Sequence, residues 1–453
     1  MKRRRLPCLG YLAGFLFLPC LLAQDGPLSI ENVTLIDGTG RPPQEDVCVL
    51  IEQQHISNIA ACPLAVPSQA VRIDGVGKFL LPGLFDVHVH LGQGLVKTGT
   101  DLEAGIRSLA AYLYCGVTTI ADLGNDADFI YSLRERERSG AIQSPRLLVS
   151  GGITTYIGGA GASNASATQA DSWPAVIPKL DANIARHPDF LSLIYDERGW
   201  GMYPRTPILP RDLAGHIIEH YADFGVRSTA HTFSEARIRE AIFLGMDTLA
   251  QPPIEAPVTS EFVRLVAAKR IPIASALSTL DSLSRLGHEP EYLDEPLYRA
   301  TIEPGDISKL KSQSSGLRND RWAEWRRLFL SVASENVEKI DEAGGVVALG
   351  TDLSVGAAVH RELELLVAAK IPPLHVIRIA TFNSAVFLGL QQETGSVEKG
   401  KLADLILLDA DPLADIRNTK RINLVIRKGH IVNRQNLDLP RKRALVIQSP
   451  NSR

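Results

Sequence analysis

The stretch Leu80-Leu81-Pro82-Gly83-Leu84-Phe85-Asp86-Val87-His88-Val89-His90 is an apolar run that ends in a pair of histidines. Side chains at positions i and i+2 of a β-strand point to the same face, so His88 and His90 are expected to present two imidazoles to one metal ion. The spacing alone is weak, because chance supplies such a pair in roughly one chain of three with this histidine content. The alternative is an ordinary strand whose histidines are satisfied by their neighbours.

The residues that follow this stretch alternate between short apolar runs and longer segments of helical period, up to about residue 385. The runs that predict parallel strands are 83–89, 117–121, 146–150, 190–195, 225–230, 247–250, 271–276 and 346–349. Strands separated by helices in this number are what a (β/α)8 barrel requires. We therefore predict an α/β fold with a TIM barrel over residues 81–385.

One segment interrupts this rhythm before the last predicted strand. Residues 278–327 are rich in charge and contain Trp322 and Trp325. An excursion of this length is expected to be a lid or an interaction surface.

Two segments, one before and one after the predicted barrel, have the sequence pattern of short β-strands. Residues 28–80 form short apolar runs with tight turns, and the pattern returns in residues 386–436. We expect the later strands to complete the sheet begun by the earlier ones, beside the barrel. Residues 437–453 are expected to be a mobile tail.

The N-terminus has the layout of a secretory signal. A basic start at Met1–Arg5 is followed by an apolar stretch, 9–23, and by a polar, Gly- and Pro-containing segment. We predict a signal peptide over residues 1–23 and a periplasmic or secreted protein. The stretch is too short to span a bilayer comfortably, so no stable membrane span is expected after cleavage. A retained membrane anchor is the alternative, and a lipid-modified Cys20 is disfavoured by Pro19.

Composition sets the class of protein. The chain has 453 residues, of which 45% are hydrophobic and 22% charged, which is typical of a globular protein with a large core. Cleavage after residue 23 removes four basic side chains and takes the formal charge from −3 to −7. Such a protein has no general attraction for nucleic acid.

Three cysteines remain after cleavage. Cys48 and Cys62 are close enough in sequence to form a disulfide in an oxidising compartment. A hairpin that turns at residues 53–54, however, places Cys48 opposite Ile59. Cys115 is expected to be a buried core thiol.

Polar residues close two further strands of the predicted barrel. His231 ends the fifth run and Asp352 follows the eighth. The carboxyl ends of barrel strands meet at one mouth, so we expect these residues to join His88 and His90. Three imidazoles and a carboxylate are a ligand set for zinc or a similar divalent ion, with a position left for water. A metal lowers the pKa of bound water to about 7, and Asp352 suits the role of base. Taken singly, His231 is also compatible with a satisfied buried histidine and Asp352 with a loop cap.

Three segments resemble the metal-dependent amidohydrolase superfamily, in particular its imidazolonepropionase-like and Xaa-Pro dipeptidase-like group. They are residues 81–90, the Gly350-Thr351-Asp352 turn, and residues 381–412 around a core at 395–405. The resemblance spans nearly the whole mature chain. It implies a barrel flanked by a composite β-sandwich of residues 28–80 and 386–436, and hydrolysis of a carbon–nitrogen or related bond of a small molecule. By the same resemblance His88, His90, His231 and Asp352 are metal ligands, and Asp352 is also the base.

The chain departs from that family pattern at three positions. Ser192 stands where two-metal members have a fourth-strand lysine that is carboxylated to bridge the ions. Gln251 stands where the sixth strand normally ends in histidine, and Ala160 where dipeptidase-like members often have histidine. Glutamine is a poor zinc ligand, although its amide can orient water or substrate. We therefore predict one divalent ion of the zinc type, with Gln251 and Tyr195 as candidate substrate contacts. A core tyrosine is the alternative for Tyr195.

Two functions of different classes are consistent with these residues. The first is an exported one-metal hydrolase acting on an amide, cyclic amide or ester of a small molecule. The second is a binding protein that keeps the barrel and has lost turnover, for which Ser192, Gln251 and Ala160 argue. The first is favoured, because a decayed site has no need of all four one-metal ligands. Non-hydrolytic chemistry at the same metal is a third alternative.

Overall fold

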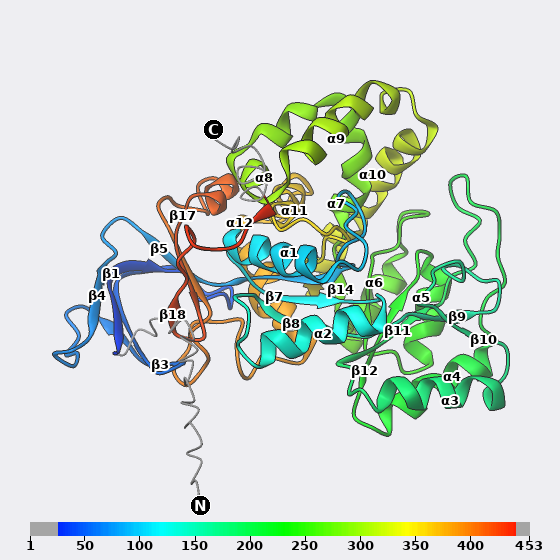
Figure 1. The fold of residues 1–453 in the computed structure, drawn as a ribbon, viewed down its shortest axis with the longest axis horizontal. Helices are drawn as coiled ribbons and strands as arrows, with labels where there is room; N and C mark the ends of the chain where they lie inside the picture. Colours follow the sequence, from blue (N-terminus) through cyan, green and yellow to red (C-terminus); the bar gives the residue numbers. More distant parts are fainter. Residues whose placement is uncertain (1–25, 441–453) are drawn as a thin grey trace, which may run out of the picture.

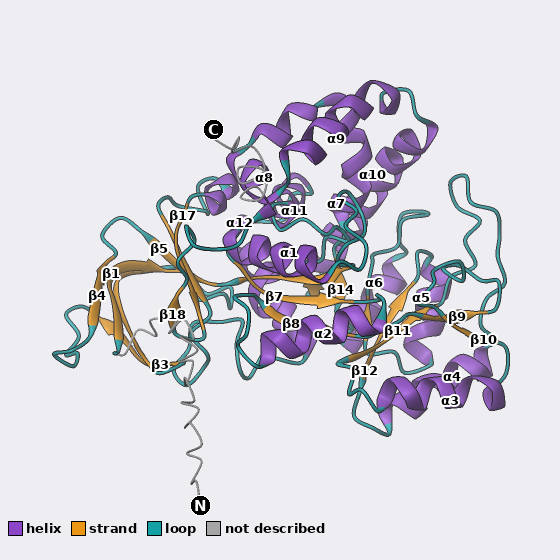
Figure 2. Ribbon diagram, in the orientation of Figure 1, coloured by secondary structure: helices purple, strands orange, loops and turns teal. Residues whose placement is uncertain are grey.

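The computed structural model describes residues 26–440. The predicted signal peptide, residues 1–23, lies outside the described residues. Strands from both ends of the described chain lie together at one end of the molecule, and the middle of the chain supplies parallel strands covered by helices (Figure 1). Helices surround the strands of the middle segment (Figure 2), so the predicted α/β class is confirmed.

All eight runs predicted to be parallel strands are strands. Three of them pair in one sheet: β6 (Leu84–Val89), β7 (Val117–Asp122) and β8 (Arg146–Val149). The other five pair in order in a second sheet: β11 (Phe190–Ile194), β12 (Arg227–His231), β13 (Thr248–Leu249), β14 (Ile273–Ala274) and β15 (Val347–Ala348). Two short strands, β9 (Thr154–Tyr156) and β10 (Thr168–Ala170), extend the second sheet beyond β11.

Backbone hydrogen bonds connect these two sheets at both sides. Val87 N donates to Leu349 O at 2.9 Å, and Asp352 N donates to His88 O at 2.8 Å, which joins β6 to the end of β15. On the other side, Asp189 N donates to Val149 O at 2.8 Å, between β8 and the start of β11. The end of β6, with His88 and His90, is therefore tied directly to the segment after β15 that carries Asp352.

Two apolar clusters fix these strands. A small cluster unites side chains from β6, β7, β8, β11, β14 and β15 with the short helix α13 (Ser384–Leu388), whose Phe387 is fully buried. The members that β14 and β15 contribute are the small residues Ala274 and Ala348. The larger cluster lies between the strands and the surrounding helices.

The helices around the parallel strands are α1 (Leu102–Tyr114), α2 (Ala127–Arg138), α3 (Trp173–Ile184), α4 (Arg211–Ala222), α5 (Glu235–Phe243), α6 (Ser260–Lys269), α11 (Ala358–Ala368) and α12 (Pro373–Arg378). Helices α2, α5 and α6 begin at polar caps, where Asp126, Ser234 and Thr259 each accept a hydrogen bond from a backbone N–H of the first turn. A π-helical turn, η2 (Ile379–Asn383), joins α12 to α13.

The excursion predicted between the last two strands is helical. It consists of α7 (Leu277–His288), the 3₁₀ turn η1 (Pro290–Asp294), α8 (Pro296–Thr301), α9 (Pro304–Leu317) and the start of α10 (Arg321–Glu342). Trp322 lies on α10 and its ring is 6.2 Å from that of Trp200, which belongs to the loop after β11. The excursion therefore packs on a loop at the carboxyl end of the strands.

The terminal sheet draws on both ends of the described chain. Its eight strands are β1 (Leu28–Leu35), β2 (Gln44–Glu52), β3 (His55–Ala61), β4 (Val71–Asp74), β5 (Phe79–Pro82), β16 (Leu405–Leu408), β17 (Ile422–Arg427) and β18 (His430–Ile431). β16 pairs antiparallel with β5, with Leu407 opposite Leu80. A further 3₁₀ turn, η3 (Ile416–Lys420), precedes β17.

The β2–β3 hairpin turns at the predicted residues but differs in register. Glu52 faces His55 as expected, whereas a one-residue shift next to Leu50 places Cys48 opposite Ala60 instead of Ile59. The shift is a β-bulge, which adds one residue to one strand. Cys48 and Cys62, which the simple register separates, form a disulfide, and Cys115 is the buried free cysteine among the described residues.

The last described residues pack against the rest of the protein. Leu437 and Leu439 are buried in the larger core, so the start of the predicted tail at residue 437 is wrong for these residues, because their apolar side chains pack. Residues 441–453 lie outside the described residues.

None of the helices in residues 26–440 combines the length and the apolar character needed to cross a bilayer.

Candidate metal centre

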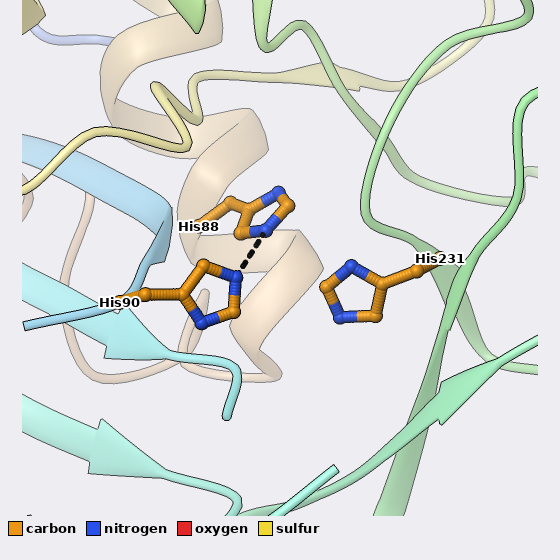
Figure 3. A group of neighbouring side chains, drawn as sticks. All are labelled: His88, His90 and His231. Carbon is orange, nitrogen blue, oxygen red and sulfur yellow. Dashed lines mark hydrogen bonds between the residues drawn. The ribbon is translucent and has the colours of Figure 1, made fainter. Parts of the chain in front are cut away.

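The pair of histidines at the end of β6 is held by backbone carbonyls. His88 Nδ1 lies 2.8 Å from Ala250 O, and His90 Nδ1 lies 2.9 Å from Gly124 O. A carbonyl oxygen only accepts, so each Nδ1 carries the ring hydrogen and each Nε2 is left with its lone pair. The two Nε2 atoms are 3.2 Å apart and point at each other (Figure 3).

His231 and Asp352 join this pair, as predicted. His231 ends β12 and faces the other two rings from the opposite side (Figure 3). One nitrogen from each of the three histidines lies within 4.8 Å of the others. Asp352 Oδ1 is 3.5 Å from His88 Nε2 and 3.6 Å from His90 Nε2. Residues that are distant in sequence thus meet at one point.

Solvent reaches one side of the group. The side chains of His90 and Asp352 are 22% and 25% exposed, whereas that of His88 is fully buried. A small molecule can therefore approach the carboxylate and one imidazole from outside, while His88 forms the floor.

Burial keeps the inner histidines neutral. Desolvation lowers the pKa of His88 to about 4, with the neighbouring His90 acting in the same direction and Asp352 opposing it. Desolvation also takes the pKa of His231 well below its usual value, and His88 and His90 lower it further. Neutral imidazole is the form that binds a metal ion.

Two buried aspartates, which no motif in the sequence singles out, support the site. Asp86 accepts hydrogen bonds from Thr351 N at 2.9 Å and Thr351 Oγ1 at 2.6 Å, which ties the turn before Asp352 to β6. Asp122 accepts from Gly124 N at 3.1 Å, next to the carbonyl that holds His90. Burial raises the pKa of both carboxyls. A charged residue inside a buried apolar strand was the available signal.

The donor set fits a divalent ion. Two lone pairs face each other at 3.2 Å with a carboxylate oxygen beside them, an arrangement that a bound cation would stabilise. Ligands at about 2.0–2.1 Å from a tetrahedral zinc lie roughly 3.3 Å apart, close to the separations seen here. Imidazole and carboxylate together are typical zinc ligands.

Ser192 and Gln251 lie against His231, on either side of its ring. Ser192 Oγ is 2.9 Å from His231 Nε2, and Gln251 Nε2 is 3.3 Å from His231 Nδ1. Gln251 Oε1 is buried and has no hydrogen-bond partner among the described residues. The residues predicted to replace second-metal ligands are therefore in contact with the predicted one-metal site.

Tyr195 is not brought to the histidines. On β11 the side chains of Phe190 and Ser192 face the inner cluster and His231, whereas Leu193 and Tyr195, the residue that follows the strand, belong to the core under the helices. The Tyr195 hydroxyl donates to Glu240 on α5 at 3.3 Å. The position is that of a core tyrosine, which was the alternative for this residue.

The chain belongs to the amidohydrolase family. Residues 79–432 match the profile of this family, which covers most of the chain. This match agrees with the resemblance found in the sequence and with the arrangement of His88, His90, His231 and Asp352 at strand ends.

Particular relatives extend this result. The chain is 32% identical over 112 residues to imidazolonepropionase of Shouchella clausii, covering 23% of this chain and 25% of that protein. It is 36% identical over 123 residues to ochratoxinase of Aspergillus niger, covering 27% and 25%. The aligned part thus spans about a quarter of the length of these curated relatives.

Solved structures share the fold over nearly their whole length. A Xaa-Pro dipeptidase with bound methionine in the active site superimposes with a TM-score of 0.71 at 21% identity, covering 90% of this chain and 100% of that chain. Aspergillus niger ochratoxinase superimposes with a TM-score of 0.68 at 20% identity, covering 90% and 95%. At these identities the likeness concerns the fold alone.

Proposed function

We propose that the protein is a metal-dependent hydrolase that cleaves a carbon–nitrogen bond, an amide or cyclic amide, or a related ester, of a small molecule. The observation that carries this proposal is the convergence of His88 Nε2, His90 Nε2 and Asp352 Oδ1 within 3.6 Å of one another, with His231 beside them. Membership of the amidohydrolase family supports it. So do the relatives whose names are those of hydrolytic enzymes.

In this proposal His88, His90, His231 and Asp352 hold one divalent ion, zinc by its preference for these donors. A bound ion of this kind lowers the pKa of water and polarises a carbonyl oxygen. Ser192 supplies no group that could bridge a second ion, and Gln251 is a poor ligand for one. Both positions favour a single ion.

Asp352 is proposed as the base. Its Oδ1 faces the histidines, and the partly exposed side chain leaves Oδ2 to accept a proton from an attacking water. The same carboxyl can then return this proton to the leaving nitrogen. Gln251 Oε1, which has no partner in the described part of the chain, is proposed to accept a hydrogen bond from the substrate or to orient the water.

The finer architecture is also a proposal. We propose that the eight parallel strands close into a (β/α)8 barrel over residues 81–385. The hydrogen bonds between β6 and β15 and between β8 and β11, and the shared inner cluster, support closure. Residues 28–80 and 386–436 are proposed as a composite β-sandwich, supported by the single sheet to which both contribute.

Export to the periplasm or the medium is the proposed location. The Cys48–Cys62 disulfide supports it, because such bonds persist in oxidising compartments. The test is the mass and N-terminal sequence of the protein recovered from the periplasmic and extracellular fractions. A start at residue 24 is expected, and recovery of the uncleaved chain in the membrane fraction would favour the retained anchor.

Metal analysis of the purified protein tests the proposal against its rival, a binding protein of the same fold without turnover. We expect about one zinc-class ion per chain, together with hydrolysis of some member of a panel of N-acyl amino acids, dipeptides, cyclic amides and esters that is lost on chelation. Two ions per chain would contradict the single-ion site. No ion and no hydrolysis would favour the binding protein, for which Ser192 and Gln251 are the specific observations.

A further inference from the structure

Ser192 lies against Nε2 of His231. Strands β11 and β12 pair in parallel with Ser192 opposite Thr229 and Ile194 opposite His231. Ser192 is 1% exposed, so its hydroxyl meets only protein atoms. These atoms are Leu123 O at 2.6 Å and His231 Nε2 at 2.9 Å.

The single hydroxyl hydrogen of Ser192 decides the direction of both contacts. Leu123 O is a carbonyl and can only accept, so the hydrogen of Ser192 points to it. Ser192 Oγ then has only lone pairs for His231. The contact at 2.9 Å is therefore a hydrogen bond donated by His231 Nε2–H.

The other ring nitrogen of His231, Nδ1, carries no hydrogen. Gln251 Nε2 lies 3.3 Å from His231 Nδ1, and an amide nitrogen donates without accepting. Nδ1 thus offers a lone pair. His231 differs in this from His88 and His90, whose Nδ1 atoms are bonded to carbonyls and whose Nε2 atoms are free.

We propose that Ser192 is a positioning residue that keeps the ring hydrogen of His231 on Nε2 and so makes Nδ1 the atom that binds the metal ion. The inference rests on the proposed metal centre and goes beyond it by assigning the ligand atom and the group that selects it. Ser192 occupies the position of the lysine that bridges the two ions in two-metal members. In this proposal Ser192 does not bind a metal ion itself but orients the ligand His231.

A serine beside a histidine also suggests a nucleophile and its base, but the geometry opposes that role. A nucleophile must present its oxygen to substrate, and Ser192 is buried. Its hydrogen is also committed to Leu123 O, so His231 has no proton to remove from it.

The first test measures the ring hydrogen directly in the metal-free protein. Long-range proton–nitrogen spectra of protein labelled with ¹⁵N-histidine distinguish the two neutral forms of imidazole, and the His231→Gln variant identifies the signals of His231. We expect the Nε2–H form in the wild-type protein. The Nδ1–H form would overturn the proposal without any variant having to fold.

The second test compares Ser192→Ala with Ser150→Ala. Ser150 is a fully buried serine that follows β8, and its hydroxyl donates to Gly151 O at 3.3 Å and not to a histidine, which makes it a matched control. We expect Ser192→Ala to give a mixture of the two forms of His231 and to weaken zinc binding about tenfold to a hundredfold, measured by competition with a chelator. Ser150→Ala should leave both unchanged.

The outcomes separate this inference from the proposed function. Tight zinc binding that is equal in wild type and Ser192→Ala would overturn the role of Ser192 and leave the metal centre standing. Absence of zinc binding in the wild-type protein would overturn the metal centre, whatever form His231 adopts. A change in the form of His231 without a change in zinc affinity would also contradict the proposal.

Discussion

Asp352 presents its carboxylate to His88 and His90 from a left-handed backbone conformation, with φ of +52°. Residues other than glycine adopt this region rarely, and aspartate and asparagine do so more readily than most. The conformation is held by the hydrogen bond from Asp352 N to His88 O and by the contacts of Thr351 with Asp86. The hydrogen bonds to the neighbouring strand β6 thus help to place the carboxylate.

Asp352→Asn should abolish hydrolysis while leaving the fold intact. Asparagine tolerates the same φ, so the backbone is kept, but the amide cannot take a proton. We expect kcat to fall at least about a hundredfold, the usual size for loss of a general base, with an unchanged melting temperature. Asp46→Asn is the control, because Asp46 also has a left-handed φ and lies exposed on β2. Undiminished activity in Asp352→Asn would refute the assigned base.

The Gln251→Leu variant tests whether Gln251 contacts the substrate or binds the metal ion. Leucine removes the amide that donates to His231 Nδ1 and the unpartnered Oε1. We expect kcat/KM to fall about tenfold, as for loss of one hydrogen bond, with zinc affinity equal or higher, because the amide no longer competes for Nδ1. The control is Gln391→Leu, since Gln391 also has a buried Oε1 without a partner in the described chain. A drop in bound zinc in Gln251→Leu would make Gln251 a ligand.

At the level of single residues, the strand ends were enough to predict which side chains meet at the proposed metal centre, but not which residues support them. His88, His90, His231 and Asp352 each close an apolar run, and the parallel arrangement brings such positions together. The roles of Ser192 and Asp86 depend on which atoms of distant segments they meet. Asp86 bonds Thr351, 265 residues later in the chain, and no local pattern contains that information.

Among the elements, the parallel strands were predicted well and the short connections less so. Buried strands of this kind read as continuous apolar runs between helices, which is a strong signal. The β2–β3 hairpin shows the limit, because one bulge moved Cys48 from Ile59 to Ala60 and allowed the bond to Cys62. The length of the excursion at 278–327 was evident from the sequence, but its fold into α7 to α10 depends on packing against the rest of the protein.

A buried histidine on helix α11 should make the stability of the protein depend on pH. His360 on α11 is buried, with Nε2 3.0 Å from Cys115 O and Nδ1 3.0 Å from Thr419 Oγ1. Burial, aided by the charge of Lys420, lowers its pKa to about 4. The unfolded chain takes up a proton below about pH 6.5 and the folded chain does not, so stability falls as the pH falls from about 6.5 to about 4. The loss at the lower end is roughly 3 kcal/mol.

His360→Gln should flatten this acid limb. Urea unfolding midpoints measured from pH 4 to 8, with chelator present so that the metal state is constant, are expected to depend less on pH in the variant than in the wild type. His88 and His231 titrate in both proteins, so the difference isolates His360. The exposed His55 provides the comparison, and His55→Gln should follow the wild-type curve. Parallel curves for His360→Gln and wild type would contradict the assignment.

In the molecule as a whole, a buried charge network joins the terminal sheet to the helices around the parallel strands. Arg427, the last residue of β17, contacts Asp404 at 3.0 Å and Glu137 of α2 at 3.2 Å. The side chains of Arg427, Asp404 and Glu137 are 8%, 0% and 6% exposed. The two acids would be left in a medium of low polarity without the guanidinium, so the junction between the two parts depends on it.

Arg427→Met should therefore destabilise the whole molecule. Methionine fills much of the space of the arginine stem but leaves Asp404 and Glu137 with only Lys428, whose Nζ lies 3.2 Å from Glu137 Oε1. We expect a loss of about 3 kcal/mol in the free energy of unfolding, measured by urea denaturation with metal content held constant. Arg417→Met is the control, because the pair of Arg417 with Asp415 lies at the surface, and its removal should not shift the midpoint. Equal midpoints for the two variants would show that the sheet is held by its apolar contacts, with the buried charges merely tolerated at the junction.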